Sequence, residues 1–366
     1  MSRVDDLIMK FCPYGVEFQL LRDVARIRNG KDYKALGDGD VPVYGTGGIM
    51  TYVDTPVYDQ ASVLIPRKGS LSKLYYVDKP FWTVDTIFYT EIGNRLVPKF
   101  LYYYLITQHL EDLNQAGGVP SLTQTVLNAL RIPTPPLEVQ QEIVRILDTF
   151  TELEAELEAE LEARRRQYAY YQHTLLTSPR SKVQIYPLSE LCEISRGRVI
   201  SKDYLRDHFG AFPVYSSQTQ NNGVFGYIDS YEYDFESITW TTDGANAGSV
   251  FYHAGEKFSI TNVCGLLRVK DNTRCSAKYL FFQLAMQAKK YVSEGMGNPK
   301  LMARAMGAVP LPIPPLAEQI RIVSILDKFD ALVNDLSTGL PAELRARRKQ
   351  YEHYRDRLLT FSEALV

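Results

Sequence analysis

One segment of this chain occurs twice, and this repeat limits the possible folds more than any other feature of the sequence. Residues 132–150 and residues 311–329 share identical side chains at eleven positions, each pair 179 residues apart. These include Pro135 and Pro314, Pro136 and Pro315, Leu137 and Leu316, Gln140 and Gln319, Ile143 and Ile322, Val144 and Val323, Ile146 and Ile325, Leu147 and Leu326, Asp148 and Asp327, and Phe150 and Phe329. A repeat unit this long indicates two duplicated domains, because the units of solenoid proteins are shorter.

The repeat extends over most of the chain. Upstream of the segment, residues 21–31 match residues 188–198, and downstream of it residues 163–168 match residues 346–351. Shorter matches are Pro42-Val43-Tyr44 with Pro213-Val214-Tyr215, Phe100-Leu101 with Tyr279-Leu280, Gly118–Leu122 with Gly297–Leu301, and Leu175-Leu176-Thr177 with Leu358-Leu359-Thr360. Each half of the chain is therefore expected to consist of a globular unit followed by a helical unit.

The two globular units, about residues 16–133 and 184–312, are expected to be mixed α+β domains. Short apolar runs bounded by turn-forming residues predict strands, and apolar residues spaced three and four apart predict helices. The predicted strands are 62–66, 85–90 and 263–269, and the predicted helices are 99–113 and 277–292.

The first helical unit is predicted to be one long helix from Leu137 to about Leu176, a stretch without Gly or Pro. Apolar residues recur there at seven-residue spacings, which is typical of a helix that packs along a partner helix. The spaced residues are Ile143, Phe150 and Leu157, and then Leu161, Tyr168 and Leu175. A helix of ~40 residues is ~60 Å long at 1.5 Å per residue, so one small domain cannot bury it and it needs a partner.

The second helical unit supplies that partner. An interruption is expected near 338–341, where Gly339 suits a C-terminal cap and Pro341 suits the first turn of a new helix. The repeat offset grows from 179 to 183 residues across this point. If the helices pair antiparallel, with the short link 177–187 leading into the second head, the pair holds two heads a fixed distance apart. Such heads suit a bipartite DNA site, whose half-site spacing mirrors protein geometry.

Composition narrows the class of protein without deciding it. The chain has 366 residues, a net charge of −2 and a pI of about 6.3, so it lacks the basic balance typical of nucleic-acid-binding proteins. The charge is uneven, however, because residues 151–163 carry six Glu and no Lys or Arg, and Arg164–Arg166 follow at once. The uneven charge is therefore compatible with a local basic surface.

The sequence shows no pattern of a metal site, a disulfide framework or a membrane segment. The four cysteines have no CxxC spacing, and none of the five histidines is placed to complete a zinc site. Met1–Lys10 lacks the apolar region of a signal peptide, and no run approaches the ~18 apolar residues of a membrane span. We therefore expect free thiols, no cofactor, no metal, no membrane partner and a cytoplasmic location.

The PxPPLxxQxxI start of both helical units, the basic-Gln-Tyr segments and the ending at 339–361 resemble the conserved regions of the specificity subunit of type I restriction–modification systems. The resemblance covers nearly the whole chain. It implies a non-catalytic subunit of α+β class, with two globular DNA target-recognition domains, two long antiparallel coiled-coil helices and a pseudo-two-fold internal repeat. The implied partners are double-stranded DNA with a bipartite site, two modification (adenine methyltransferase) subunits and a restriction subunit.

The resemblance and the repeat together predict four parts. They are a first target-recognition domain at 1–133, a first spacer helix at 134–178, a second target-recognition domain at 179–312, and a second spacer helix at 313–366, broken near 338–341.

Three loops of the first head are candidate DNA contacts. The Gly-rich stretch within 41–54 permits close approach to a phosphate or base edge, although an ordinary hairpin turn has the same composition. The basic pair that follows residues 62–66 fits a contact with phosphate or guanine, but a solvated surface pair has the same pattern. The third loop, Gly118–Leu122, equally suits a structural turn. The candidate residues are Tyr44, Gly45, Thr46, Gly47, Arg67, Lys68, Ser70 and Lys73.

The second head carries different side chains in the matching loops, so we expect the two heads to read different DNA sequences. Residues 215–222 are rich in amides and hydroxyls, which suit adenine edges, or else form a solvated loop. In residues 241–244 a Thr and an Asp replace the basic pair. Lys300 lies in the third loop, where it can contact a phosphate. The candidate residues are Arg198, Ser216, Ser217, Gln218, Gln220, Asn221, Thr241, Thr242 and Lys300.

The helical units carry further candidates with more than one interpretation. Arg164–Arg166 and Arg347–Lys349 suit DNA, a partner subunit or solvent. Tyr168, Tyr171, Tyr351 and Tyr354 lie near helical spacing and are expected to pack rather than to stack on bases. Within 151–163 a Leu-Glu-Ala-Glu tetrad recurs; one more tetrad would add ~6 Å, or one to two base pairs at ~3.4 Å each. The tetrads also suit a merely soluble helix.

Two other classes of function stay open. An enzyme of the DNA methyltransferase or nuclease type is one, but an adenine methyltransferase needs an Asn/Asp-Pro-Pro-Tyr/Phe motif. Thr134-Pro-Pro-Leu137 and Ile313-Pro-Pro-Leu316 lack both its polar and its aromatic residue. A structural coiled-coil scaffold is the other; it explains the helices, but not two heads with different polar loops at matched positions.

Overall fold

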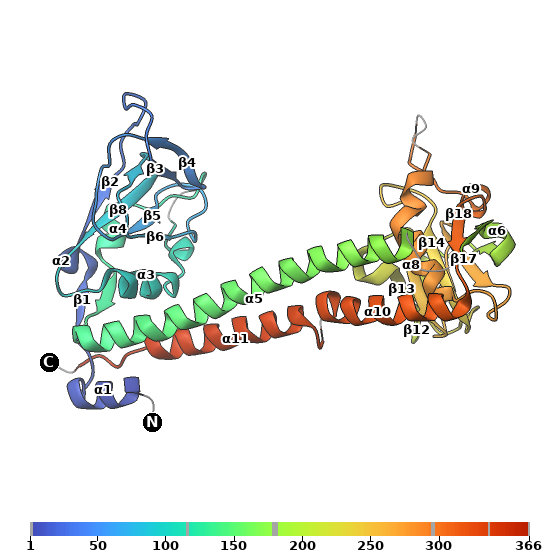
Figure 1. Cartoon of the computed structure of the whole chain (residues 1–366). Coiled ribbons are helices and arrows are strands. Elements are labelled where there is room, and N and C mark those ends of the chain that lie inside the picture. Colours follow the sequence, from blue (N-terminus) through green and yellow to red (C-terminus); the bar gives the residue numbers. More distant parts are fainter. Residues whose placement is uncertain (1–2, 115–116, 178–181, 294–296, 336, 365–366) are drawn as a thin grey trace. The chain divides into compact units, whose positions relative to one another are not determined.

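The computed structural model describes residues 3–114, 117–177, 182–293, 297–335 and 337–364 (Figure 1). The chain forms two compact units, Met1–Glu158 with Glu343–Val366, and Ala159–Ala342. Each unit contains one head and a pair of helices. Helix α5 (Leu137–Thr177) is continuous and contributes its first part to one unit and its second part to the other. Residues 178–181, the start of the predicted link, lie outside the described residues.

The first head combines three small sheets with short helices. Its elements are, in chain order, α1 (Arg3–Phe11), β1 (Phe18–Leu20), α2 (Leu21–Val24), β2 (Ala25–Asn29), β3 (Val41–Gly45), β4 (Gly48–Val53), β5 (Ser62–Pro66), β6 (Tyr75–Val77), β7 (Trp82–Thr83), β8 (Ile87–Ile92), α3 (Pro98–Ile106), η1 (Leu110–Leu113), α4 (Gln124–Asn128) and β9 (Arg131–Pro133). The strand orders are β2-β8-β5-β6, β4-β3-β7 and β1-β9.

The second head repeats this plan. Its elements are β10 (Gln184–Pro187), α6 (Leu188–Leu191), β11 (Cys192–Arg196), α7 (Lys202–Asp207), β12 (Phe212–Tyr215), η2 (Gln220–Gly223), β13 (Val224–Ile228), β14 (Glu236–Thr241), β15 (Val250–Ala254), β16 (Ser259–Ile260), β17 (Cys264–Val269), α8 (Ala277–Gln287), η3 (Ala288–Tyr291), α9 (Ala303–Gly307) and β18 (Pro310–Ile313). The strand orders β11-β17-β14-β15, β13-β12-β16 and β10-β18 match those of the first head one for one. The duplication expected from the sequence is therefore confirmed.

The central strands are continuous apolar runs because both of their faces are covered. Every residue of β5 is buried, and so is every residue of β14 after Glu236. β8 and β6 flank β5 on its two edges, and α3 packs across β5 and β6. The predicted strands at 62–66 and 263–269 are confirmed, and the strand predicted at 85–90 lies slightly later, as β8.

Two helix predictions were too long, and several short helices, with α1 the longest of them, were missed. The predicted helix 99–113 ends as α3 at Ile106, because His109 has a left-handed backbone (φ 44°) and a 3-10 turn follows it. The predicted helix 277–292 ends as α8 at Gln287 and also continues as a 3-10 turn. Helix α1 was not predicted, although Val4 lies in the core of the first unit.

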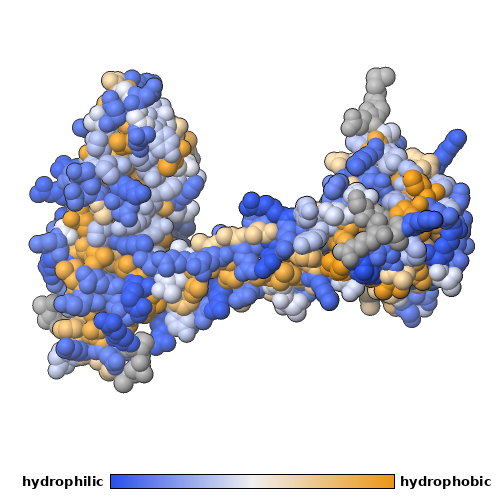
Figure 2. All heavy atoms as spheres, in the orientation of Figure 1, coloured by the Kyte–Doolittle hydropathy of each residue, from blue (hydrophilic) through white to orange (hydrophobic). Residues whose placement is uncertain are grey.

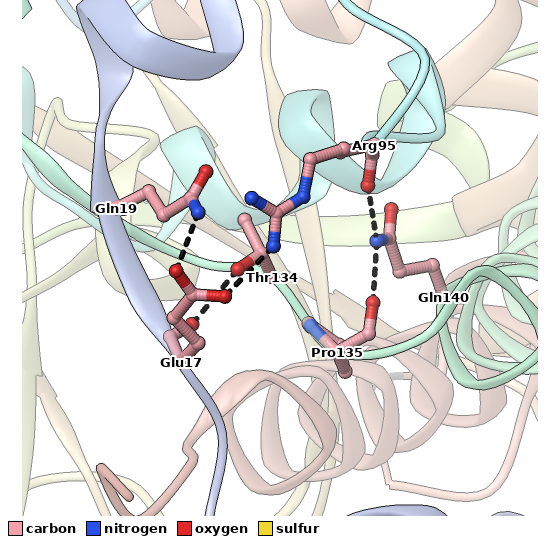
Figure 3. Close-up of polar contacts among 6 residues, drawn as sticks. All are labelled: Glu17, Gln19, Arg95, Thr134, Pro135 and Gln140. Atoms are coloured by element: carbon pink, nitrogen blue, oxygen red, sulfur yellow. Dashed lines mark hydrogen bonds and ion pairs between the residues drawn. The ribbon is translucent and has the colours of Figure 1, made fainter. Parts of the chain in front are cut away.

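The glutamine of the repeated motif joins each helix to its head. The Gln140 side chain is fully buried, and its Oε1 accepts from the Val97 amide at 2.7 Å. Its Nε2 donates to the carbonyls of Arg95 at 2.9 Å and Pro135 at 2.7 Å (Figure 3). The Arg95 guanidinium also contacts Glu17 next to β1. Buried amides are costly to leave unpaired, so this side chain fixes where the long helix starts relative to the head.

Gln319 forms the same joint in the second unit. Its Oε1 accepts from the Ser276 amide at 2.9 Å, and its Nε2 donates to the carbonyls of Arg274 at 3.0 Å and Pro314 at 2.8 Å. The repeated aspartates also act alike, because Asp148 pairs with Lys99 at 2.8 Å and Asp327 pairs with Lys278 at 2.9 Å. The repeated motif is therefore a head-to-helix joint.

The repeated phenylalanines explain the tyrosines of the basic-Gln-Tyr segments. In the first unit α5 pairs with α11 (Leu340–Leu359), and the Phe150 ring lies 6.4 Å from that of Tyr351 and 5.5 Å from that of Tyr354. Arg348 also bonds Glu154 and Glu158 of α5. Because rising numbers on α11 meet falling numbers on α5, the two helices run antiparallel within this unit.

The second unit repeats this packing, but here α5 contributes the tyrosines and the other helix contributes the phenylalanine. The Phe329 ring of α10 (Leu316–Asn334) lies 6.2 Å from that of Tyr168 and 5.3 Å from that of Tyr171 on α5. Leu176 shares a core with Ile322 and Leu326, so this pair is also antiparallel. The prediction that these tyrosines pack is confirmed.

The break in the second helical segment is confirmed, but its predicted cap is wrong. α10 ends at Asn334, and Gly339 directly precedes α11 instead of capping α10. A Cβ on Gly339 would lie 2.5 Å from the carbonyl oxygen of Ala331, which is why only glycine fits. The Asp335 carboxylate holds the turn by accepting from Ser337 and Thr338, as well as from their amides.

Candidate nucleic-acid interface

The Gly-rich stretch of the first head forms the tight hairpin between β3 and β4. Gly45 pairs with Gly48, so Thr46 and Gly47 form a two-residue turn. Gly48 has a φ of +119°, a left-handed conformation that glycine adopts without strain. Gly45 is buried and Tyr44 and Thr46 are half-buried, so Gly47 is the most exposed backbone at the tip.

The three candidate loops of the first head lie together. The Thr46 hydroxyl donates to the Thr86 carbonyl at 3.1 Å, and the Lys73 ammonium donates to the Gly47 carbonyl at 3.1 Å. Lys68 forms an antiparallel bridge with Ser121 of the third loop. One surface therefore combines the hairpin tip, the basic loop and residues 118–122, which are far apart in the sequence.

This surface carries uncompensated positive charge. Lys68, Ser70 and Lys73 are exposed, and Arg67 is half-buried with its guanidinium 5.9 Å from the centre of the Phe88 ring. Within the described part of the chain, neither Arg67 nor the two lysines form an ion pair with a carboxylate. Cations without carboxylate partners beside an exposed glycine backbone suit a polyanion such as DNA.

In the second head a short segment, residues 261–263, brings the candidate groups together. Arg198 forms a bridge with Thr261, and the Ser216 hydroxyl lies 2.8 Å from that of Thr261. The Thr242 amide donates to the Val263 carbonyl at 3.1 Å. The loop between β12 and β13 is longer than its counterpart, and Gln220 and Asn221 are exposed at its tip, while Ser216, Ser217 and Gln218 are half-buried.

The hydrogen bonds between loops show which residues of the two heads are equivalent here, and they confirm that Thr and Asp replace the basic pair. Leu122 donates to the Arg67 carbonyl as Leu301 donates to that of Thr242, and the amides of Gly69 and Gly244 bond Pro120 and Pro299 alike. Arg67 therefore corresponds to Thr242, and Lys68 to Asp243. The charge at that position is reversed, and Asp243 forms an ion pair with Lys300 at 3.7 Å.

Several candidates of the second head have structural roles. Thr241 and Thr242 have no exposed surface, and the Thr241 hydroxyl donates to the Asn246 carbonyl. The Arg198 guanidinium bonds Glu232 at 2.5 Å and the Tyr204 hydroxyl at 3.1 Å. Buried side chains cannot reach DNA without rearrangement, so exposed residues are the better candidates in this head.

Two exposed lysines near this surface were missed by the sequence reasoning. Lys289 and Lys290 lie in η3, and the Cα of Lys289 is 3.2 Å from where a Cβ of Gly248 would lie. The Gly248 amide donates to the Thr241 carbonyl at 2.9 Å, so the pair borders the 241–244 loop. Consecutive lysines after an apolar helix were the signal in the sequence.

A buried polar group also distinguishes the second head. His253 is 2% exposed; its Nε2 lies 2.8 Å from the Thr239 hydroxyl, and its Nδ1 lies 2.7 Å from Glu256. Burial lowers the pKa of His253, although the Glu256 carboxylate opposes this shift. We therefore assign a neutral ring that donates from Nδ1 and accepts at Nε2. Strand register places Val77 at the equivalent position of the first head.

The described residues also define the state of the cysteines and the arrangement of potential metal ligands. No group of three or more His, Cys, Asp or Glu side chains is arranged to bind a metal in the described ranges. All four cysteines are free and buried, and burial raises the pKa of Cys192, Cys264 and Cys275 to about 12. Among the described helices, none has the length and apolar character that a membrane crossing requires.

Comparison with known proteins gives a consistent result. Residues 13–163 and 180–346 each match the type I restriction modification DNA specificity domain. A candidate type I specificity subunit of Mycoplasma pneumoniae is 39% identical over 69% of this chain and 94% of its own length. A candidate type I restriction enzyme specificity subunit of Haemophilus influenzae is 31% identical over 95% of this chain and 96% of its own.

A solved structure shares the fold. The S subunit of a type I restriction-modification system from M. genitalium superimposes with a TM-score of 0.67 at 17% identity, over 94% of this chain and 96% of that one. The family domain matches both halves of the chain, and both halves contain the same strand order and the same head-to-helix joint. The chain therefore belongs to the family of type I restriction–modification specificity subunits.

Proposed function

We propose that this chain is the non-catalytic, sequence-reading subunit of a type I restriction–modification complex, in which each head binds one half of a bipartite DNA site. The observation that carries the proposal is the duplication itself. Two heads share strand order and helix joints, yet they present different side chains at equivalent loop positions. Shared scaffolds with different reading loops are what two unlike half-sites require.

The proposed functional parts are those predicted from the sequence: heads at 1–133 and 179–312, and spacer helices at 134–178 and 313–366. The proposed DNA contacts are the exposed candidates of each head, three half-buried ones (Thr46, Arg67 and Ser217) and the missed lysines. In the first head they are Thr46, Gly47, Arg67, Lys68, Ser70 and Lys73; in the second head they are Ser217, Gln220, Asn221, Lys289, Lys290 and Lys300.

The proposed partners are two modification subunits, which supply methyl transfer, and a restriction subunit that joins them. Two antiparallel helix pairs, one in each unit, offer two equivalent docking places, which supports two copies of one partner. The helices of α5, α10 and α11 then set the spacing between the half-sites. In this proposal the chain binds and positions DNA and carries out no chemistry of its own.

Mapping methylated bases in cells that express this chain with its modification subunit tests the proposal. The expected result is a methylated sequence of two unlike specific parts separated by an unspecified gap. A single uninterrupted or palindromic motif would contradict it. So would methyl transfer to DNA by the purified chain with S-adenosylmethionine alone.

A further inference from the structure

Each head contains a pocket beside its helix pair, and the two pockets are copies of each other. The pocket of the first unit has a volume of about 440 Å³, and that of the second unit about 340 Å³. Three identical residue pairs line both; they are Tyr44 and Tyr215, Tyr76 and Tyr252, and Lys99 and Lys278. The loops of the two heads have diverged, whereas these pockets have been retained.

The walls of both pockets are aromatic. Three further pairs of aromatic residues occupy equivalent positions; they are Tyr75 and Phe251, Tyr102 and Phe281, and Tyr103 and Phe282. The Lys99 ammonium lies 5.4 Å from the centre of the Tyr76 ring, and that of Lys278 lies 5.0 Å from the centre of the Tyr252 ring. Aromatic faces attract cations, and guanidinium groups most often.

Both rims carry more negative than positive charge. In the first pocket Lys99 is neutralised by Asp148, and Glu154 by Arg348, whereas Glu152 has no ion-pair partner among the described residues. In the second pocket Lys278 is neutralised by Asp327.

Glu256 and Asp330 remain on the second rim. Asp330 accepts hydrogen bonds only from uncharged groups, the Tyr168 hydroxyl and the Asn334 amide, within the described ranges. Such rims repel phosphate and attract a cation.

A retained, duplicated pocket fits a ligand that is the same at both heads. DNA differs between the two heads in the proposed function, and its phosphates are excluded by the acidic rims. We propose that each pocket receives a basic side chain from one of the two modification subunits. This inference rests on the proposed function, which supplies two copies of one partner protein. An arginine fits best, because its planar group can stack on a tyrosine while bonding a rim carboxylate.

Cysteine protection tests the inference and leaves the aromatic walls of both pockets unchanged, although Asp330→Cys removes one carboxylate of the second rim. Thr151→Cys and Asp330→Cys place a thiol on the two rims at equivalent positions, and both native side chains are exposed. Thr149→Cys and Lys328→Cys are matched controls, because they lie two residues away on the same helices, are also exposed and line neither pocket. The four native cysteines are buried, so a maleimide should label the new thiols selectively.

The expected result is that the modification subunit slows labelling of Thr151→Cys and Asp330→Cys by about tenfold or more, while labelling of the two controls changes by about twofold or less. Duplex DNA alone should slow none of the four. Equal labelling of rim and control cysteines in the complex would overturn the inference. Protection by DNA alone would overturn it as well and would assign the pocket to a nucleotide.

A charge reversal gives an independent measurement. Glu152→Lys should weaken the binding of one modification subunit by about tenfold, whereas Glu156→Lys, one turn further along α5 and outside the pocket, should change it by about twofold or less. Equal affinities of the two variants would contradict the inference. Gel filtration of the wild-type mixture separates the two levels of failure. If no complex forms, the proposed function fails; if it forms and the rim variants behave as controls, only the pocket assignment fails.

Discussion

The two heads differ most where they are expected to meet DNA and least where they meet their helices. Both heads fasten the helix start with a buried glutamine that makes three hydrogen bonds. Their loops, by contrast, exchange Lys68 for Asp243 at one equivalent position. Figure 2 shows the visible face of each head as hydrophilic residues interspersed with smaller hydrophobic patches. The residues that position the helices on the heads are therefore different from the residues that are expected to recognise DNA.

The electrostatics of the two reading surfaces differ as well. The first surface has Arg67, Lys68 and Lys73 without carboxylate partners in the described part of the chain. The second neutralises Lys300 with Asp243 and Arg198 with Glu232, which leaves the two lysines Lys289 and Lys290 without a carboxylate partner among the described residues. We therefore expect the first head to supply more of the salt-dependent affinity, and the second to depend more on the amides at the tip of its β12–β13 loop.

The largest expected effect tests what the heads share. Gln140→Ala and Gln319→Ala each leave a buried amide hydrogen and two carbonyls without their partner, at a cost of about 3 kcal/mol in the free energy of unfolding. Urea denaturation followed by tryptophan fluorescence measures this, because Trp82 lies in the first head and Trp240 in the second. Gln141→Ala, the exposed neighbour on α5, should cost about 0.5 kcal/mol or less. If Gln140→Ala and Gln319→Ala lower the free energy of unfolding no more than this control does, the claim that both glutamines stabilise equivalent joints is refuted.

The next effect tests the basic surface of the first head. Lys68→Gln and Lys73→Gln together should weaken DNA binding by roughly 10- to 100-fold and lower the salt dependence by about two charges. Fluorescence anisotropy with a labelled duplex at several salt concentrations measures both quantities. Lys10→Gln, an exposed lysine of α1, serves as the control and should leave them unchanged. An equal loss with the control would mean that net charge, not this surface, governs binding.

A smaller effect tests the neutralised surface of the second head. Asp243→Asn removes the partner of Lys300, so its ammonium becomes free to contact a phosphate, and DNA affinity should rise by about threefold. The same anisotropy titration measures this change. Asp229→Asn, an exposed aspartate of the same head, should raise affinity less. A decrease in affinity with Asp243→Asn would show that the carboxylate holds the loop in its reading conformation.

The smallest effect is a pH dependence confined to the second head. The pKa of His253 is lowered by burial, so an unfolded chain binds this proton more readily than the folded one. The stability that the neutral His253 contributes is fully present above the pKa of 6.5 of the unfolded chain. It is lost as the pH falls toward and through the lower pKa of the folded chain.

Lowering the pH from about 7.5 to about 5.5 should therefore destabilise the second head more than the first, and thermal melting at the two pH values measures this difference. His253→Gln should flatten this difference while lowering stability at neutral pH. A steeper loss in the first head, where Val77 takes the equivalent place, would reject the assignment.

Local patterns made the helical segments predictable from the sequence. The seven-residue spacing and the absence of Gly and Pro predicted α5 because both act within the segment itself. The helix ends after Ile106 and Gln287 were not predictable, since apolar spacing continues into the 3-10 turns that follow. Helix α1 was missed because its burial depends on contacts with residues far along the chain, such as Glu142.

The candidate site was only partly predictable for the same reason. The repeat located the loops, but the bridge of Lys68 with Ser121 joins residues that no sequence pattern connects. The repeat alone predicts that Thr and Asp replace the basic pair, and the hydrogen bonds between loops confirm this equivalence. Burial of Thr241 and Thr242 likewise depends on the loops packed over them.

The most direct test of the account is an insertion of one additional Leu-Glu-Ala-Glu tetrad within residues 153–160 of α5. Long-read sequencing then maps the methylated sites of wild type and variant. It shows whether the heads recognise the sequence while the helices set the spacing between half-sites. The insertion adds ~6 Å of helix at 1.5 Å per residue. We predict that both half-site sequences stay the same and that the gap between them grows by one or two base pairs of ~3.4 Å. Methylation at an unchanged gap, or a change in either half-site sequence, would contradict the account.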